Sequence, residues 1–190
     1  MKTSPFVKKP IWYEACSCYG MGNASSLDWF AVYVKSRHEF AAANDLSNKG
    51  TEVFLPAITK QRQWKDRKKL VEFPLFPGYL FVHIRPDPEE LTTVLRARGA
   101  VNVLSLEPGR PASIPEEEIH SLKLMLSGGA ELDIYPHLKE GTRVRVRRGS
   151  LKGATGILKS KKDQHMFLVN IELLGRSVGM QINADDVEES

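Results

Sequence analysis

The sequence predicts an α+β fold, in which an N-terminal α/β sandwich on an antiparallel sheet is linked to a small five-stranded C-terminal β-barrel. Residues 29–126 alternate between strand and helix patterns, which is typical of helices packed on a sheet. From residue 139 onward, apolar residues recur every two positions and glycines separate the short segments, as expected for a small barrel. Between these regions the chain holds a Gly-Gly pair and a loop-like stretch.

The composition is that of an ordinary globular protein. The chain has 190 residues, 42% hydrophobic and 26% charged, with a net charge of +4; this suits one large or two small domains. Charges interrupt every apolar run before it reaches the length of about 18–20 residues that a membrane helix needs. Cys16 and Cys18 are too few for a disulfide framework. We therefore expect a cytoplasmic monomer without a membrane segment.

Four segments are expected along the chain. Residues 1–27 lack a sustained period and are rich in loop-forming residues, so they are interpreted as a flexible extension. Residues 28–127 form the first domain, residues 128–138 the linker, and residues 139–190 the barrel domain. The boundary falls where the apolar period changes from three or four residues to two.

The first domain opens with a strand at 29–35, rich in aromatic and β-branched residues. Ser36 and Glu39 have the spacing of a capping box, so a helix is expected to follow directly and to end at Gly50. The last helix begins with Pro115 in its first turn, next to three acids that suit the positive end of a helix. Between these helices the pattern predicts strands at 52–55, 78–84 and 101–106, a charged hairpin at 58–72 and a short helix after Pro88.

The second domain is expected to consist of strands, because β-branched residues fill the segments between its glycines. A helical hairpin over residues 142–182 would have to absorb five glycines, from Gly149 to Gly179, at about 1 kcal/mol each. The predicted strands cover residues 143–147, 155–161, 166–171, 177–182 and 185–187.

An aromatic set shares one face of the first sheet. Strand alternation places Tyr79 and Phe81 together, and Tyr33 on the corresponding face of the first strand. With Phe54 and Phe76, these rings form either an exposed protein-binding patch or a second core beneath the last helix. Since the C-terminal segment offers no continuous apolar stripe, we expect the patch to be open or shielded only by the linker.

Basic residues concentrate in two blocks. Residues 60–69 hold six Lys or Arg and one acid, and residues 139–163 hold nine against two. Such blocks indicate a polyanion or an acidic protein as partner, or else a solvated face. The hairpin is therefore either an additional phosphate-contacting tip or a solvated hairpin.

Catalytic and metal-binding patterns are not found. The five histidines are scattered, without a pair at metal-ligand spacing, and no phosphate-binding loop or nucleophile elbow is present. We therefore expect a protein that is not an enzyme and that holds neither a metal nor a cofactor.

Two motifs then carry a resemblance. Residues 73–82 (FPLFPGYLFV), after an opening strand at 29–34 (WFAVYV), resemble the N-terminal domain of the NusG family of transcription elongation factors. Residues 140–146 (EGTRVRV) and 149–156 (GSLKGATG) resemble the KOW motif of the same family's second domain. The match covers residues 29–188, and the Pro74–Pro77, Thr92-Thr93 and Arg98-Gly99 segments are most similar to the specialised RfaH-like paralogues.

The resemblance implies a transcription elongation and antitermination factor that binds RNA polymerase across the DNA channel and suppresses pausing or termination. Tyr33, Tyr79 and Phe81 would contact the clamp of the largest subunit, and Phe54 and Phe76 are expected to be part of the same polymerase-binding surface. Thr92 and Thr93 would contact the opposite pincer, and Lys35, Arg37 and Arg98 the non-template DNA strand. Leu173, Leu174 and Arg176 of the KOW domain would recruit a small-subunit ribosomal protein or the termination factor Rho.

An alternative function is a KOW-type module that binds RNA in association with the ribosome. Arg143, Arg145, Arg147, Arg148 and Lys152 would suit this role. That alternative assigns no function to the first domain.

Overall fold

The first sheet is organised around strand β1 (Asp28–Val34). The computed structural model describes residues 26–64, 67–107, 109–129, 132–136, 141–161 and 164–190, so most of the predicted extension at 1–27 lies outside the described residues. The strand order is β2 (Glu52–Phe54), β5 (Tyr79–Ile84), β1 and β6 (Ala100–Val103), all antiparallel. The short β9 (Ser113–Ile114) pairs with the beginning of β1.

Helices cover both faces of this sheet. α2 (Glu39–Asn48) and α3 (Pro88–Leu95) pack on the face that carries Phe30, Val32, Leu80 and Val82. α4 (Glu116–Ser127) lies against the opposite face. Since the aliphatic residues of β1 and β5 alternate with the aromatic ones, the two faces have different cores. The α+β sandwich predicted from the sequence is confirmed.

The capping box predicted at Ser36 and Glu39 is not formed. α2 begins at Glu39, its N-cap residue is His38, and no side chain caps the helix. Arg37 has a positive φ of 64°, so the chain turns sharply between β1 and α2 instead of entering a helix at Ser36. The Glu39 carboxylate accepts a hydrogen bond from another part of the chain, as described below.

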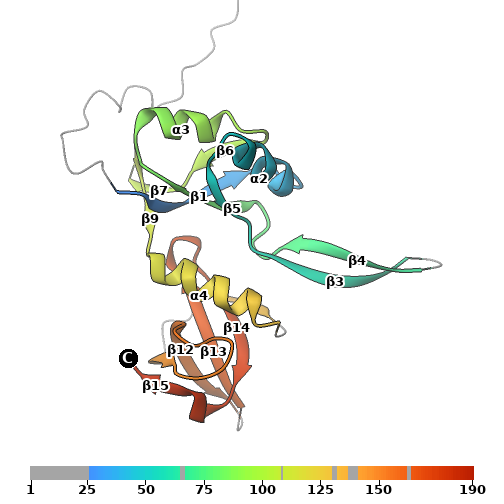
Figure 1. Cartoon of the computed structure of the whole chain (residues 1–190), viewed down its shortest axis with the longest axis vertical. Coiled ribbons are helices and arrows are strands. Elements are labelled where there is room, and N and C mark those ends of the chain that lie inside the picture. Colours follow the sequence, from blue (N-terminus) through green and yellow to red (C-terminus); the bar gives the residue numbers. More distant parts are fainter. Residues whose placement is uncertain (1–25, 65–66, 108, 130–131, 137–140, 162–163) are drawn as a thin grey trace, which may run out of the picture.

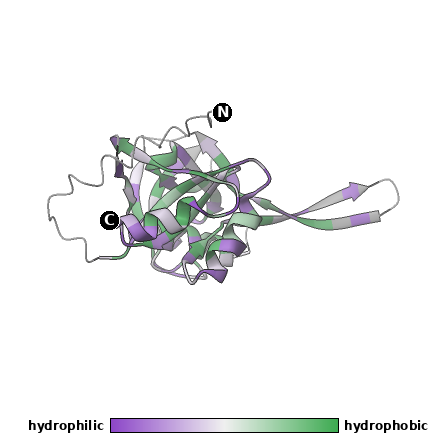
Figure 2. Cartoon of the chain, turned by 90° about the horizontal axis from the view of Figure 1, so that it is seen from above, coloured by the Kyte–Doolittle hydropathy of each residue, from purple (hydrophilic) through white to green (hydrophobic). Residues whose placement is uncertain are grey.

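A long hairpin projects from the first sheet. β3 (Ala57–Trp64) and β4 (Arg67–Pro74) form a two-stranded sheet of their own. It extends away from the remainder of the molecule in two views at right angles (Figures 1 and 2). A second, smaller ribbon joins β7 (Ser105–Glu107) to β8 (Arg110–Pro111).

The C-terminal part is a six-stranded antiparallel sheet. Its strand order is β10 (Asp133–Pro136), β14 (Arg176–Ile182), β13 (Gln164–Ile171), β12 (Thr155–Lys161), β11 (Thr142–Val146) and β15 (Val187–Glu189). The predicted all-β character is confirmed. The interpretation of 128–138 as a linker was wrong in part, because β10 lies within it and pairs with β14.

α4 lies between the two sheets (Figure 1). It packs on β1 on one side and on β12 and β13 on the other, and one continuous core runs from Trp29 through Leu122 to Phe167. α4 therefore belongs as much to the second sheet as to the first. Within the described residues, none of the helices is long and apolar enough to cross a membrane.

Candidate functional site

Two tyrosines lie side by side where β1 ends and β5 begins. Tyr33 is the register partner of Tyr79, and their ring centroids are 5.5 Å apart with the planes tilted by 50°. Tyr33 is 42% exposed, and Tyr79 is half-buried. Tyr33 is therefore the exposed member of the predicted aromatic set.

The backbone at Gly78 determines how these rings meet. Gly78 has φ of +85°, and a Cβ at this position would lie 3.4 Å from the ring of Tyr33. Its amide donates a hydrogen bond to Glu39 Oε1 at 2.8 Å, and its carbonyl accepts one from the Val34 amide at 2.8 Å. Glu39 is only 4% exposed. The buried carboxylate therefore ties the beginning of β5 to the beginning of α2, next to the tyrosine pair.

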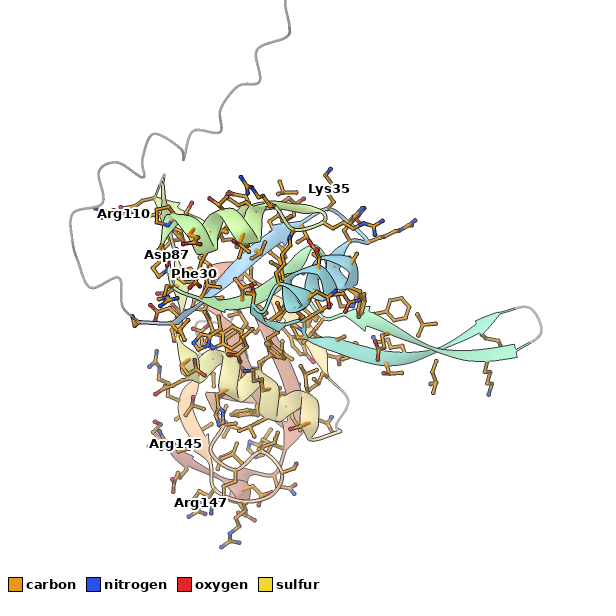
Figure 3. The ribbon with its side chains drawn as sticks, turned by 45° about the horizontal axis from the view of Figure 1, so that its top comes forward. Phe30, Lys35, Asp87, Arg110, Arg145 and Arg147 are labelled. Carbon is orange, nitrogen blue, oxygen red and sulfur yellow. The ribbon has the colours of Figure 1, made fainter. Side chains whose placement is uncertain are left out.

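Two adjoining loops carry the predicted DNA-binding residues. The amide of Lys35 donates to the carbonyl of Gly99 at 2.8 Å, so the loop after β1 lies against the loop that contains Arg98. The side chains of Lys35, Arg37 and Arg98 are all exposed, and Lys35 points outward at the edge of the domain (Figure 3). The three cations thus occupy one end of the sheet, the end that also holds Tyr33.

Asp45 on α2 fixes the second of these loops. Its Oδ2 accepts a hydrogen bond from the Arg98 amide at 2.9 Å and one from the Lys49 ammonium at 2.9 Å. The Lys49 hydrogen bond and the Arg98 amide hold the pKa of Asp45 below its ordinary value. Asp45 is therefore an ionised anchor that places the backbone of Arg98.

The two predicted threonines lie on α3, on the other face of the first sheet. Thr92 Oγ1 donates to the carbonyl of Pro88 at 2.6 Å, and Thr93 Oγ1 donates to the carbonyl of Glu89 at 3.0 Å. Both side chains are half-buried, and Leu91 next to them packs into the core with Val32. The hydroxyl protons are engaged within the helix, while each oxygen can still accept a hydrogen bond.

The expectation of an open aromatic patch was wrong for its inner members. Phe76 and Phe81 are 0% exposed, and their rings meet edge to face at 6.0 Å. Phe54 is half-buried and stacks on Phe81, also at 6.0 Å. The apolar face of α4, including Leu122, covers these rings together with Leu75. The second-core alternative therefore describes this face, because an amphipathic helix found an apolar sheet surface to bury.

A polar cluster closes the edge of this aromatic core. Trp29 stacks on His83 with the ring centroids 4.8 Å apart, and Lys123 Nζ of α4 lies 4.4 Å from the centroid of the Trp29 ring. Glu52 lies within 3.7 Å of the Lys123 ammonium and 2.9 Å of His83 Nδ1. The cation–π contact and the ion pair hold α4 in its position over β1.

The predicted partner-binding loop of the second domain lies against α4. Leu173 and Leu174 form a short 3₁₀ turn (Glu172–Leu174) that ends at Gly175, where φ is +59°. Both leucines are partly buried against the shared core, and Arg176 is half-buried at the beginning of β14. The structure therefore keeps these three residues together, with their apolar parts turned toward the core.

α4 contacts the second sheet through two polar residues. Ser121 is 1% exposed, and its Oγ accepts a hydrogen bond from the amide of Thr155 at 2.9 Å. One turn earlier, Glu118 lies beside Glu172 at an open cavity of about 380 Å³ that Arg143 and Arg145 also line.

Glu118 is the most perturbed acid at this contact. Its Oε2 is buried and has no hydrogen-bond partner among the described residues. Burial raises the pKa of Glu118 to about 7, with a further increase from the nearby Glu172 charge, against the lowering effect of a hydrogen bond from the Glu172 backbone. The carboxyl therefore titrates near neutral pH.

The basic block of the second domain is partly neutralised by the C-terminal strand. β15 pairs with β11 so that Glu188 is opposite Arg145, and Glu188 lies 3.8 Å from Arg147. Arg145 and Arg147 lie at the far end of the molecule from Lys35 (Figure 3). The arginines that would serve the alternative RNA-binding function thus have an acidic strand beside them.

Three structural residues of the site were not found from the sequence. The spacing assigned Glu39 to a capping box. Its hydrogen bond with the Gly78 amide joins residues 39 positions apart, so a local sequence pattern cannot predict it. Asp45 and Lys123 act across sequence separations of 53 and 94 residues, toward Arg98 and Trp29. No local signal marks such partners. In the described part of the chain, no group of three or more His, Cys, Asp or Glu side chains is placed to hold a metal ion.

Comparisons with known proteins agree with this architecture. Residues 27–123, just over half of the chain, match the family model described as "NusG: Transcription termination factor nusG". The transcription termination/antitermination protein NusG of Chlamydia trachomatis serovar D is 25% identical over 171 residues, covering 84% of this chain and 91% of that protein. The protein of the same name from Thermus thermophilus is 25% identical over 182 residues, covering 85% and 98%.

A solved structure shows the same fold. The one described as "Domain interaction in Thermotoga maritima NusG" has a TM-score of 0.50 and 19% identity, and the match covers 88% of this chain and 99% of that one.

Proposed function

Because the chain belongs to the NusG family of transcription factors, we propose that it binds RNA polymerase across the DNA channel, suppresses pausing or termination, and recruits a partner through its KOW domain. Its role in transcription comes from the family. In this proposal the protein acts by binding rather than by catalysis, through contacts made by a small number of side chains.

The observation that supports the proposal most strongly is the tyrosine pair, in which Tyr33 is exposed and Tyr79 is half-buried. Tyr33 and Tyr79 present two neighbouring rings on a rigid sheet, and tyrosine is among the residues that most often dominate the affinity of protein interfaces. Phe76 and Phe81 are buried in the core against which Tyr79 packs, and Phe54 is half-buried beside them. In this proposal the pair contacts the clamp of the largest subunit, and the buried Phe76 and Phe81 support it without touching the polymerase.

The two faces of the first sheet suit a bridge between the two sides of the polymerase cleft. Thr92 and Thr93 are on α3, whereas Tyr79 packs toward the opposite core. A protein that contacts both sides favours the closed, elongating state by its differential affinity for that state. A difference of about 1–3 kcal/mol would change pausing severalfold to a hundredfold.

The exposed cations at the end of the sheet support a contact with the non-template DNA strand. Lys35, Arg37 and Arg98 lie on two loops joined by the Lys35–Gly99 hydrogen bond, so phosphates passing this end would meet all three. Arg96, also exposed at the end of α3, would extend the same surface.

For the KOW domain we propose that Leu173, Leu174 and Arg176 contact a small-subunit ribosomal protein or Rho. Leu173 and Leu174 lie in the short turn that ends at Gly175, directly before Arg176, and all three side chains keep part of their surface exposed beside the shared core. The alternative function, an RNA-binding module, has less support, because Glu188 lies beside Arg145 and Arg147.

The test is the affinity of the full chain for a reconstituted elongation complex. Tyr33→Ala and Tyr79→Ala are each expected to weaken binding by about tenfold to a hundredfold, as truncation of an interface hot spot does. Pause durations on the same template should lengthen toward those without the factor.

Ile134→Ala is the matched control, because Ile134 is 43% exposed, close to the 42% of Tyr33, but lies on β10 of the second sheet. Its binding should equal that of the unmodified chain. Unchanged binding in both tyrosine variants, or an equal loss in the Ile134 variant, would refute the assignment of the tyrosine pair.

A further inference from the structure

A buried carboxylate lies at the end of the first sheet. Glu39 is 4% exposed, although it stands in the first turn of α2, where an acid normally meets the positive end of the helix dipole in solvent. Glutamate is almost never buried to this extent unless its charge is paired or hydrogen-bonded. The position of Glu39 therefore requires a partner that compensates for the loss of water.

This partner is the backbone of Gly78. The buried Gly78 amide donates a hydrogen bond to Glu39 Oε1 at 2.8 Å, across a sequence separation of 39 residues. A buried N–H without an acceptor costs free energy comparable to a lost hydrogen bond. The Glu39 carboxylate therefore stabilises the backbone conformation in which the Gly78 amide points toward α2.

Gly78 in turn determines where the two tyrosines lie. Its φ is +85°, and a Cβ at this position would lie 3.4 Å from the Tyr33 ring. Its carbonyl accepts a hydrogen bond from the Val34 amide at 2.8 Å, and the next residue, Tyr79, pairs with Tyr33. Glycine populates positive and negative φ about equally. The hydrogen bonds on both sides of Gly78 therefore select the conformation that brings the two rings together.

Core packing alone does not explain a carboxylate at this place. An apolar side chain could fill the same volume without removing a charge from water, and such replacements of buried charges are often neutral or stabilising. The buried neighbours of Glu39 on α2, Ala42 and Leu46, are apolar and 0% exposed. Glu39 supplies what an apolar residue lacks, an acceptor for the Gly78 amide.

We propose that Glu39 is a positioning residue for the tyrosine pair, and that its carboxylate holds Gly78 so that Tyr33 and Tyr79 have the geometry that binds polymerase before contact is made. This inference rests on the proposed function, because it concerns the same surface. Hydrogen bonds that fix the orientation of binding residues lower the entropy lost when the partner binds. Glu39 itself does not touch the polymerase in this proposal and acts through the two rings.

The experiment measures the affinity of full-length variants for a reconstituted elongation complex. Glu39→Ala removes the acceptor and is expected to weaken binding by about tenfold. Glu39→Gln keeps a side-chain oxygen that can accept the hydrogen bond from Gly78, so its affinity should stay within about threefold of that of the unmodified chain. An equal loss of affinity in the two variants would overturn the proposal, because the hydrogen bond would then not be the cause.

Leu46→Ala is the matched control for stability. Leu46 lies on the same helix, is 0% exposed and packs in the core beneath α2. Its truncation leaves a cavity, so the melting temperature should fall at least as much as in Glu39→Ala, while the affinity should stay within about twofold of that of the unmodified chain. A loss of affinity equal to that of Glu39→Ala would show that binding follows stability, and Glu39 would then have a structural role only.

A double-mutant cycle tests whether Glu39 acts through the rings. Residues that work as one unit give non-additive losses. In a chain that already carries Tyr33→Ala and Tyr79→Ala, adding Glu39→Ala should therefore weaken binding by less than about twofold. A further loss as large as that in the unmodified background would overturn the proposal, because Glu39 would then act on binding independently of the tyrosines.

A nuclear magnetic resonance signal of the free chain keeps this inference separate from the proposed function. The Gly78 amide proton should move upfield in Glu39→Ala, where its hydrogen bond is lost, and should stay near its original position in Glu39→Gln and Leu46→Ala. An unchanged signal in Glu39→Ala would overturn the proposal. If the tyrosine variants keep full affinity, the proposed function fails; if they lose affinity and Glu39→Ala does not, only the positioning role fails.

Discussion

Replacing Phe81 by alanine is expected to destabilise the first domain by about 3–5 kcal/mol. Phe81 is 0% exposed and contacts Phe54 and Phe76 with ring centroids 6.0 Å away in each case. Removing a buried side chain of this size loses about 2–3 kcal/mol of favourable transfer free energy from water to the core. The cavity beneath α4 and the two lost ring contacts add about 1–2 kcal/mol.

The assay is urea denaturation followed by circular dichroism, with Tyr33→Ala as the comparison. Tyr33 is 42% exposed, so its truncation should cost less than about 1 kcal/mol. A destabilisation of 3–5 kcal/mol corresponds to a decrease in melting temperature of roughly 6–20 °C for a chain of this size.

The opposite pattern would refute the assignment of Phe81 to the core. If Phe81→Ala lost polymerase binding while its free energy of unfolding changed by less than about 1 kcal/mol, the ring would act at the surface. The open aromatic patch expected from the sequence would then be correct, and α4 would not cover this face in solution.

Two further predictions concern backbone strain and pH. Gly78→Ala and Gly50→Ala should each lower the free energy of unfolding by about 1–2 kcal/mol, because φ is +85° and +84° at these glycines. Only Gly78→Ala places a methyl group against Tyr33, so only that variant should also weaken polymerase binding. An equal loss of affinity in both variants would contradict this. In the folded protein the pKa of Glu118 is about 7, whereas its ordinary pKa is 4.5. Between these two pH values the folded state binds more protons than the unfolded state, so stability should fall as the pH rises from 4.5 to 7. The expected decrease is about 1–2 kcal/mol after allowance for partial exposure. Urea denaturation at pH 5 and pH 8 should show this decrease for the unmodified chain and a smaller one for Glu118→Gln, and parallel profiles would contradict it.

Local patterns predicted the elements of the first sheet well. In β5, Leu80, Val82 and Ile84 face α2 and α3, as strand alternation required. The patterns could not decide what covers the opposite face, because that depends on where α4 packs after the chain folds back. Phe81 looks the same in the sequence whether a partner protein or the chain's own helix lies over it.

Spacing alone also misassigned two short segments. Ser36 and Glu39 have the separation of a capping box, but the Glu39 carboxylate is used by Gly78, 39 residues away. β10 was interpreted as linker because four residues with one proline carry little periodicity, and its pairing with β14 is a tertiary effect. In both cases the pattern missed hydrogen bonds to residues that are distant in the sequence.

During synthesis, α4 leaves the ribosome before the second sheet exists. Residues 128–190 follow it, and at about 5–20 residues per second they take roughly 3–13 s to be made. The strands of the first sheet are complete by then, so Lys123 can already settle over Trp29. Ser121 must wait for the amide of Thr155. We therefore expect the second sheet to fold onto a helix whose position the first sheet has already set.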